Sequence, residues 1–326
     1  MPGVPIPKSK IENPKYYMAS FFLAFKTILP LFLIILAGVV MLKLKAATLE
    51  WSDVLNKYAL KIGFPALIFS ALVKMDFSFT EQSTLIYTNS IYLVLCMLLA
   101  FPVGTIFKVS AKNRQTLILL LAFGNITYLG IPVIVSTLGD IARGPAVLIT
   151  AMNLFWMFSM ALILIEVADD SKLHFKTILV KLVTNPLLIA VFLGLIGSAL
   201  HIPTQSSVMK SLDLISQSVT ALVLLSLGIF MGSQKLGKLR DWVPVFGLSL
   251  AILVILPGIF YFFLKFTHMD TLSFRCSVLD AAMPSGLTAY ALSHQYGLNT
   301  KLAGRLVVLS TFLSLFTLPV WIALTA

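Results

Sequence analysis

The chain has 326 residues, of which 59% are hydrophobic and only 11% are charged, whereas soluble domains carry about 25% charged residues. This composition excludes an ordinary soluble enzyme and predicts an integral membrane protein. The net charge of +11 does not indicate a nucleic-acid partner, because most Lys and Arg residues lie in short gaps between apolar runs, where they control membrane topology.

Ten apolar stretches are long enough to cross a bilayer, which takes about 20 residues. In chain order they cover residues 20–42, 54–73, 85–107, 116–138, 144–166, 178–200, 207–231, 242–264, 272–296 and 302–323. A polar tail, residues 1–19, precedes them, and residues 167–177 form a linker near the middle of the chain. We therefore predict an all-α polytopic membrane protein with ten transmembrane helices in a lipid bilayer.

The basic residues indicate how these helices are oriented. One set of gaps carries Lys43, Lys45, Lys108, Lys112, Arg114, Lys172, Lys176, Lys235, Lys238, Arg240 and Lys301. The other set carries only Lys74, Arg143 and Lys265. The positive-inside rule places the first set in the cytoplasm, so both termini are predicted to be non-cytoplasmic, although three Lys residues in the tail favour the opposite orientation. We expect a multi-pass protein of the cell membrane, such as the inner membrane of a bacterium.

The fourth stretch, residues 116–138, is not an ordinary helix. Gly and Pro are the weakest helix formers, and non-helical backbone at membrane depth occurs only inside protein or along a wet cavity. We predict a first half that ends near Phe123 and a second half that begins near Ile131. A proline-kinked helix facing lipid is the alternative. The interrupting residues are Gly124, Asn125, Thr127, Gly130 and Pro132.

The ninth stretch, residues 272–296, is interrupted in the same way. Asp280 precedes its proline by four residues. Two interrupted stretches in corresponding positions of two halves indicate a transporter binding site. The interrupting residues are Pro284, Ser285, Gly286 and Thr288.

The two halves share further features at a steady offset. Pro30 corresponds to Pro186, Pro102 to Pro257 and Gly124 to Pro284, at offsets of 156, 155 and 160 residues. An offset close to half the chain predicts a five-helix unit used twice, over residues 20–166 and 178–323. Because five is an odd number, the second unit enters the membrane from the opposite side, which makes the pair an inverted repeat.

Several segments, in order along nearly the whole chain, carry a family resemblance. They are FPALIFSAL at 64–72, GNITYLGIP at 124–132, NP at 185–186, SLGIFM at 226–231 and DAAMPSGLTAYALSHQYG at 280–297. Together they resemble the auxin efflux carrier family, which includes bacterial carriers and plant auxin carriers, within the bile acid, arsenite and riboflavin transporter superfamily.

This resemblance implies that the fourth and ninth helices cross at their breaks, as in bile-acid symporters and sodium/proton antiporters. It also implies a scaffold of helices one, two, six and seven and a transport domain of helices three to five and eight to ten. We further expect a homodimer through the scaffold helices. Plant members have a proline where Gly124 stands here. They also carry an acid and a lysine on the third helix, where this chain has Tyr87, Thr88, Asn89 and Ser90.

The breaks are suited to binding an anion. The second half of a broken helix begins with free N–H groups, which carry about half a positive charge and favour anions. We predict a carboxylate site made by the backbone near the breaks and by side-chain donors. The alternative is that the polar groups only satisfy carbonyls freed by the breaks. The predicted site residues are Gly124, Asn125, Thr127, Gly130, Pro284, Ser285, Gly286 and Thr288.

Asp280 is a candidate for proton coupling. An ionised Asp at a helix centre costs about 2.5–3.5 kcal/mol on the insertion scale, so such a residue pairs with another group or carries protons. Arg275, five residues earlier, is too far round the turn for an ideal intrahelical pair, but the break could bring it near enough to be a partner. The alternative is a permanently paired structural carboxylate. In plant members of the family, Gln stands at the matching position.

These features predict a secondary active transporter or facilitator of a small organic anion. We expect it to work by elevator-type alternating access, with proton coupling as one candidate energy source. No GxxxxGK[ST] nucleotide motif is present, and neither a metal nor a cofactor is predicted. The alternatives are a sodium-coupled organic anion symporter and a transport-dead ligand-binding sensor. An enzyme is not expected, because Ser285 and His294 lie nine residues apart, too far along a helix to share a hydrogen bond.

Overall fold

The computed structural model describes residues 14–75, 79–168, 180, 182–234 and 237–326. The elements before residue 169 are α2 (Pro14–Lys43), α3 (Leu49–Tyr58), η1 (Ala59–Gly63), α4 (Phe64–Val73), α5 (Phe79–Ile106), α6 (Ala111–Ala122), η2 (Ile126–Gly130), α7 (Ile131–Leu138), η3 (Asp140–Ala142) and α8 (Arg143–Ala168). The later elements are α10 (Pro186–Ala199), α11 (Ser207–Ser233), η4 (Leu239–Trp242), α12 (Val243–Leu250), η5 (Ala251–Ile255), α13 (Leu256–Leu264), α14 (Thr271–Ala281), α15 (Leu287–Gln295) and α16 (Thr300–Thr325).

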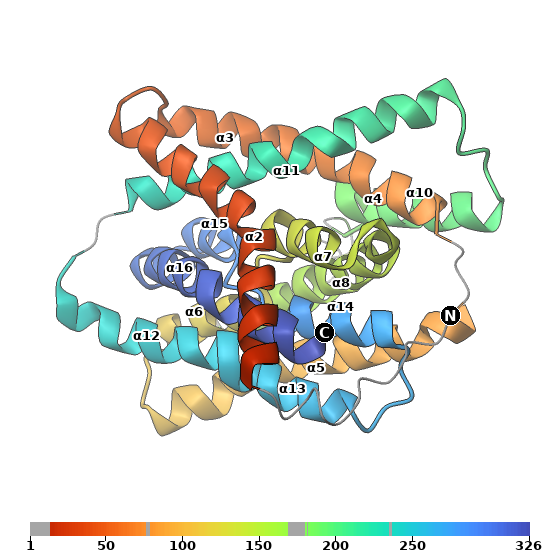
Figure 1. The fold of residues 1–326 in the computed structure, drawn as a ribbon. Coiled ribbons are helices and arrows are strands. Elements are labelled where there is room, and N and C mark those ends of the chain that lie inside the picture. Colours follow the sequence, from red (N-terminus) through yellow and green to blue (C-terminus); the bar gives the residue numbers. More distant parts are fainter. Residues whose placement is uncertain (1–13, 76–78, 169–179, 181, 235–236) are drawn as a thin grey trace.

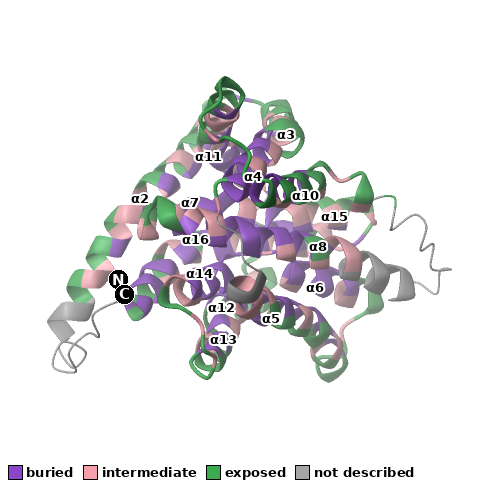
Figure 2. Cartoon of the chain, turned by 90° about the vertical axis from the view of Figure 1, so that its right-hand side faces the viewer, coloured by how far each residue is buried: buried purple, intermediate pink, exposed green. Residues whose placement is uncertain are grey.

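The helices form two outer groups with a central group between them. Figure 1 shows α3, α4, α10 and α11 along one side of the molecule and α5, α12 and α13 along the opposite side. The helices α7, α8, α14, α15 and α16 lie between these groups, and α2 runs across them. In Figure 2, buried residues concentrate on central helices such as α8 and α14, and exposed residues on the outer helices. Large apolar side chains on the outer surface, such as those of Leu36, Phe192 and Phe262, are more than half exposed, as expected of a surface that faces lipid.

Each predicted span coincides with helical structure, although some boundaries differ. The helix α2 begins at Pro14, so part of the predicted tail is helical, because the apolar run continues back towards that residue. The helix α10 begins at Pro186, where Asn185 caps it by accepting a hydrogen bond from the N–H of Leu187 at 2.9 Å. The predicted linker, residues 167–177, lies outside the described residues from residue 169 onward.

Six helical segments among the described residues are long and apolar enough to cross a membrane. They support the prediction of a polytopic α-helical membrane protein, whereas the arrangement of ten spans as an inverted repeat stays a prediction. The six segments are Met18–Lys43, Gln82–Ile106, Asp140–Ser159, Ser207–Ser233, Leu239–Leu264 and Thr300–Thr325.

Three helical stretches contain a wide turn of the π type, and each of these turns ends two residues before a proline. The turns η1, η2 and η5 are followed by Pro65, Pro132 and Pro257. A proline has no N–H and its ring clashes with the carbonyl four residues earlier, and a wide turn accommodates such a position. In η5 the carbonyl of Leu253, which loses the N–H of Pro257, accepts the indole N–H of Trp321 at 2.8 Å instead.

Glycines allow two pairs of outer helices to pack closely. On α11, a Cβ at Gly228 would fall on the backbone carbonyl of Ile35 in α2, next to the Cα of Gly38. On α10, a Cβ at Gly194 would lie 2.9 Å from the Cβ of Leu72 in α4. Small residues let membrane helices approach at the backbone. An exchange of the two predicted halves would turn the pair α2 and α11 into the pair α10 and α4, so both close contacts occupy corresponding positions in the repeat that we predict.

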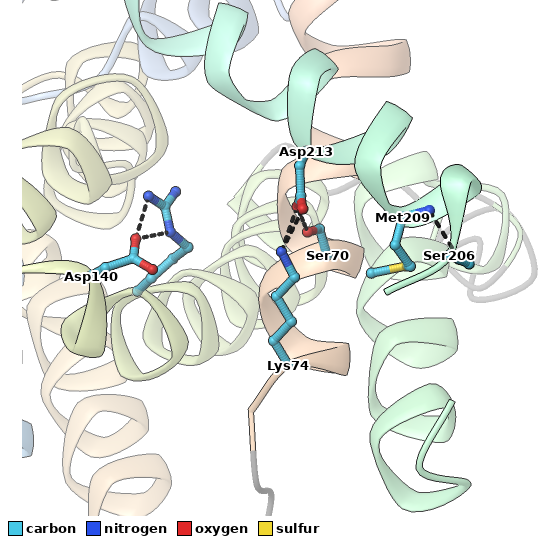
Figure 3. A network of polar contacts seen from close by, with 7 residues as sticks. Ser70, Lys74, Asp140, Ser206, Met209 and Asp213 are labelled. Carbon is cyan, nitrogen blue, oxygen red and sulfur yellow. Dashed lines mark hydrogen bonds and ion pairs between the residues drawn. The ribbon is translucent and has the colours of Figure 1, made fainter. Parts of the chain in front are cut away.

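A polar network joins α4 to α11 near one end of these helices. Lys74 donates to both carboxylate oxygens of Asp213, at 2.7 and 2.6 Å, and Ser70 donates to one of them (Figure 3). Nearby, Asp140 of η3 forms an ion pair with Arg143 at 2.6 Å. Lys74 and Arg143 are two of the three basic residues in the less basic set of gaps, and both are therefore paired with carboxylates.

Candidate functional site at the two helix breaks

Both predicted breaks are present. The helix α6 ends at Ala122 and helical structure resumes at Ile126, with α7 following from Ile131. The helix α14 ends at Ala281, and α15 begins at Leu287. The breaks occur where Gly and Pro were expected to interrupt the fourth and ninth stretches, which excludes a continuous, merely kinked helix in both places.

The two breaks bind each other through the main chain. The N–H of Asn125 donates to the carbonyl of Pro284 at 2.6 Å, and the N–H of Gly286 donates to the carbonyl of Phe123 at 2.6 Å. Gly124 and Ser285 form an antiparallel bridge between these bonds. The two stretches thus satisfy each other's freed backbone groups, which buried backbone away from water requires.

A small cavity lies beside this crossing. Five predicted residues line it, namely Gly124, Asn125, Thr127, Gly286 and Thr288. Its opposite wall comes from α8, through Thr150 and Asn153. The cavity volume is about 20 Å³, which holds about one water molecule. A larger solute would therefore require the wall from α8 and the crossing to separate.

Three predicted residues lie elsewhere. Gly130 donates its N–H to the carbonyl of Asn125 at 3.0 Å and packs against Met283, away from the cavity. Pro284 contributes its carbonyl to the crossing, and its side chain does not line the cavity. Ser285 is fully buried and lines neither of the two cavities.

Polar groups at the crossing are buried without partners. Both amide atoms of Asn125 and the hydroxyl of Ser285 lack a hydrogen-bond partner among the described residues, although these side chains are 2% and 0% exposed. Asn125 and Gly286 occupy the cap positions of the two second halves, and neither provides a side-chain cap. The first N–H groups of these halves therefore have no intrahelical acceptor, and Thr127 and Thr288 from the two first turns line the same cavity as Asn125.

Asp280 lies at a second cavity, of about 40 Å³, on the other side of Gly124 and Asn153. Its Oδ2 accepts a hydrogen bond from Nδ2 of Asn153 at 2.9 Å. The expected partner, Arg275, forms no ion pair with it, and Nε of Arg275 has no partner among the described residues. The prediction of an Arg275–Asp280 contact is wrong, because the two residues lie five apart on the continuous part of α14 and so point in different directions.

Asn153 was not among the predicted site residues, and neither were Thr150 and Tyr92, which line the two cavities. A polar residue in an apolar helix was the only available signal. On the third stretch, Thr88, Asn89 and Ser90 are buried without lining either cavity, and Tyr87 is exposed. Asn89, for example, donates to the carbonyl of Leu85 and to the hydroxyl of Ser277, both at 2.8 Å.

Comparison with known proteins identifies the family. Residues 23–322 match the family described as membrane transport protein. The chain belongs to this family. Membership confirms the predicted resemblance to auxin efflux carriers and supports a membrane transport protein that is not an enzyme. The multi-pass arrangement of apolar helices agrees with this assignment.

Relatives of this membrane transport protein come from archaea, bacteria and plants. An "Uncharacterized transporter" of Methanothermobacter thermautotrophicus is 27% identical over 304 residues, which cover 91% of this chain and 96% of that protein. A "Putative malonate transporter" of Rhizobium meliloti is 22% identical over 296 residues, which cover 89% of this chain and 92% of that protein. Auxin efflux carrier component 8 of Arabidopsis thaliana is 24% identical over 147 residues, which cover 42% of this chain and 38% of that protein.

Proposed function

We propose that this membrane transporter carries a small organic anion and binds its carboxylate at the crossing of the two broken helices. The observation that carries the proposal is the buried amide of Asn125, which has neither a donor nor an acceptor among the described residues. It lies where two helix N-termini meet, and such ends favour anions. Thr127 and Thr288 line the same cavity and offer hydroxyl donors. A relative described as a malonate transporter makes a dicarboxylate the first substrate to test.

Transport by an elevator motion is the mechanism that we favour. In this mechanism, α2, α3, α4, α10 and α11 stay fixed, and the remaining helices carry the crossing across the membrane. The close glycine contact between Gly38 and Gly228 supports a rigid first group. A homodimer through the first group is part of this proposal.

Proton coupling through Asp280 is the favoured energy source, and a sodium-coupled symporter is the second candidate. Asp280 is buried with one free carboxylate oxygen, and an intramembrane carboxyl of this kind is suited to carrying a proton. A sodium ion would need several further oxygen ligands, which the cavity around Asp280 does not bring together. A sensor that binds the anion without moving it would share the same site.

The test is uptake of radiolabelled malonate into proteoliposomes, with an imposed pH gradient or an imposed sodium gradient. We expect uptake by the wild type to follow the pH gradient and to fall at least about tenfold in Asn125→Ala, since the loss of a hydrogen bond to a charged group costs about 1.5–3 kcal/mol. Asn89→Ala is the matched control, because it removes another buried asparagine that faces neither cavity. Wild-type malonate binding without uptake would favour the sensor, and equal uptake by Asn125→Ala would refute the proposed site.

A further inference from the structure

Asn153 on α8 lines both cavities, as Gly124 and Ile126 do. It donates a hydrogen bond from Nδ2 to Oδ2 of Asp280 at 2.9 Å, and no described residue donates to its own Oδ1. Asp280 and Asn153 are 6% and 3% exposed, so this bond is formed inside the protein. A single side-chain amide therefore contacts the buried carboxylate and borders the cavity of Asn125.

The carboxylate of Asp280 is only partly hydrogen-bonded, which favours its binding a proton. Its Oδ1 is buried without a hydrogen-bond partner, and no Lys or Arg within the described ranges forms an ion pair with it. A buried charge is costly unless it is paired and fully hydrogen-bonded. A proton on the carboxyl group would remove the charge, and a proton on Oδ2 would also make the group a donor at the atom that Asn153 contacts.

Few other titratable groups lie close to Asp280. Tyr92 and Cys96 on α5 are the titratable groups that line the cavity with Asp280, and Arg275 and Cys276 lie earlier on α14 itself. Among the described residues, Tyr87 and Lys301 on the elements packed against α14 are exposed. The other charged or titratable groups on these elements have contacts of their own: Tyr128 with Phe64, Tyr261 with Phe274, Lys265 with Tyr261, Asp140 with Arg143, and Arg305 with Asp241.

We infer that Asp280 is a proton-binding site and that Asn153 links its protonation to anion binding by reversing its side-chain amide. An ionised carboxylate can only accept hydrogen bonds, so it holds the NH₂ group of Asn153 and leaves the amide oxygen towards the first cavity. Protonated at Oδ2, Asp280 donates instead, and the amide turns so that its oxygen accepts this hydrogen bond. The NH₂ group then points into the first cavity, where it can donate to a carboxylate beside Asn125.

The consequence is that a proton and an anion bind together. With Asp280 ionised, the cavity presents an amide oxygen, which repels an anion; with Asp280 protonated, it presents a donor. Linkage requires that each ligand strengthens the binding of the other by the same factor. This inference rests on the proposed function for the identity of the anion, but the proton site and the amide reversal are properties of the chain alone.

Infrared difference spectra of the purified transporter between alkaline and acidic pH test these properties without a substrate. We expect a protonated-carboxyl band that is absent in Asp280→Asn. We also expect a shift of the Asn153 amide band, which disappears both in Asp280→Asn and in Asn153→Val. Asn153→Thr is the matched variant, because Thr has the shape of Val and keeps a hydroxyl that can donate and accept. A wild-type spectrum equal to that of Asp280→Asn would overturn the inference.

Calorimetry with malonate in buffers of different ionisation enthalpy tests the linkage. We expect uptake of about one proton per malonate in the wild type, none in Asp280→Asn, little in Asn153→Val and an intermediate value in Asn153→Thr. Uptake by Asn153→Val equal to that of the wild type would refute the role of Asn153, as would a wild type without proton uptake. If malonate does not bind the wild type while the infrared bands are present, the proposed substrate fails and the proton site stands.

Discussion

The N–H of Gly286 donates to the carbonyl of Phe123 at 2.6 Å, and this contact leaves no space for a side chain at residue 286. A Cβ there would lie 2.8 Å from the carbonyl oxygen of Gly124. The backbone angles of Gly286, φ −87° and ψ 154°, suit any residue. The requirement for glycine is therefore one of space between two main chains, and it can be tested separately from backbone strain.

Gly286→Ala should separate the two breaks. We expect a lower melting temperature in detergent and loss of malonate uptake, because the clash is with backbone atoms that cannot rotate away. Gly247→Ala on α12 is the control, since no atom lies within 4 Å of a Cβ at that position and Ala is favoured over Gly in a helix by about 1 kcal/mol. Equal melting temperatures for the two variants would contradict the tight crossing.

Trp321→Phe should destabilise the protein although it keeps an aromatic ring. The substitution leaves the carbonyl of Leu253 without its donor, and an unsatisfied buried group costs about 1–3 kcal/mol. Pro257→Ala in the same chain should restore part of the lost stability, because Ala supplies the N–H that the proline lacks. Thermal unfolding of both single variants and the double variant measures this coupling, and additive effects would argue against it.

A cross-link between α11 and α15 should stop transport if the proposed motion occurs. The rings of Phe230 and Tyr290 pack with centroids 4.6 Å apart, and they belong to the proposed fixed and moving groups. We expect Phe230→Cys with Tyr290→Cys to lose malonate uptake by about tenfold or more after thiol cross-linking, with recovery on reduction.

The control for this experiment is a cross-link inside the fixed group. Tyr58 and Ser218 share a hydrogen bond of 2.8 Å between α3 and α11, so Tyr58→Cys with Ser218→Cys should keep its uptake when cross-linked. Full uptake by the cross-linked Phe230 and Tyr290 pair would rule out relative movement of α11 and α15. Single-cysteine variants correct for any effect of the substitutions alone.

The positions of the breaks could be predicted because Gly124 and Pro284 act locally on helix formation. The bond between Asn153 and Asp280 could not be, because it joins residues 127 positions apart and depends on how α8 packs against α14. That Ser285 lines no cavity was missed for a different reason: the sequence marks an interruption, but not the antiparallel pairing with Gly124 that holds Ser285 in the crossing. The wide turns before Pro65 and Pro257 were also missed, since a proline near a helix start usually signals a new helix.

The joint between the breaks is built from main-chain atoms of Phe123, Asn125, Pro284 and Gly286, and so it does not depend on the identity of the polar side chains around it. Thr127, Thr150 and Thr288 can therefore be exchanged for other residues while the architecture persists. Carriers with new substrate preferences should be obtainable by randomising these three threonines together while the main-chain joint is kept. Related chains can diverge in substrate preference through the same three positions.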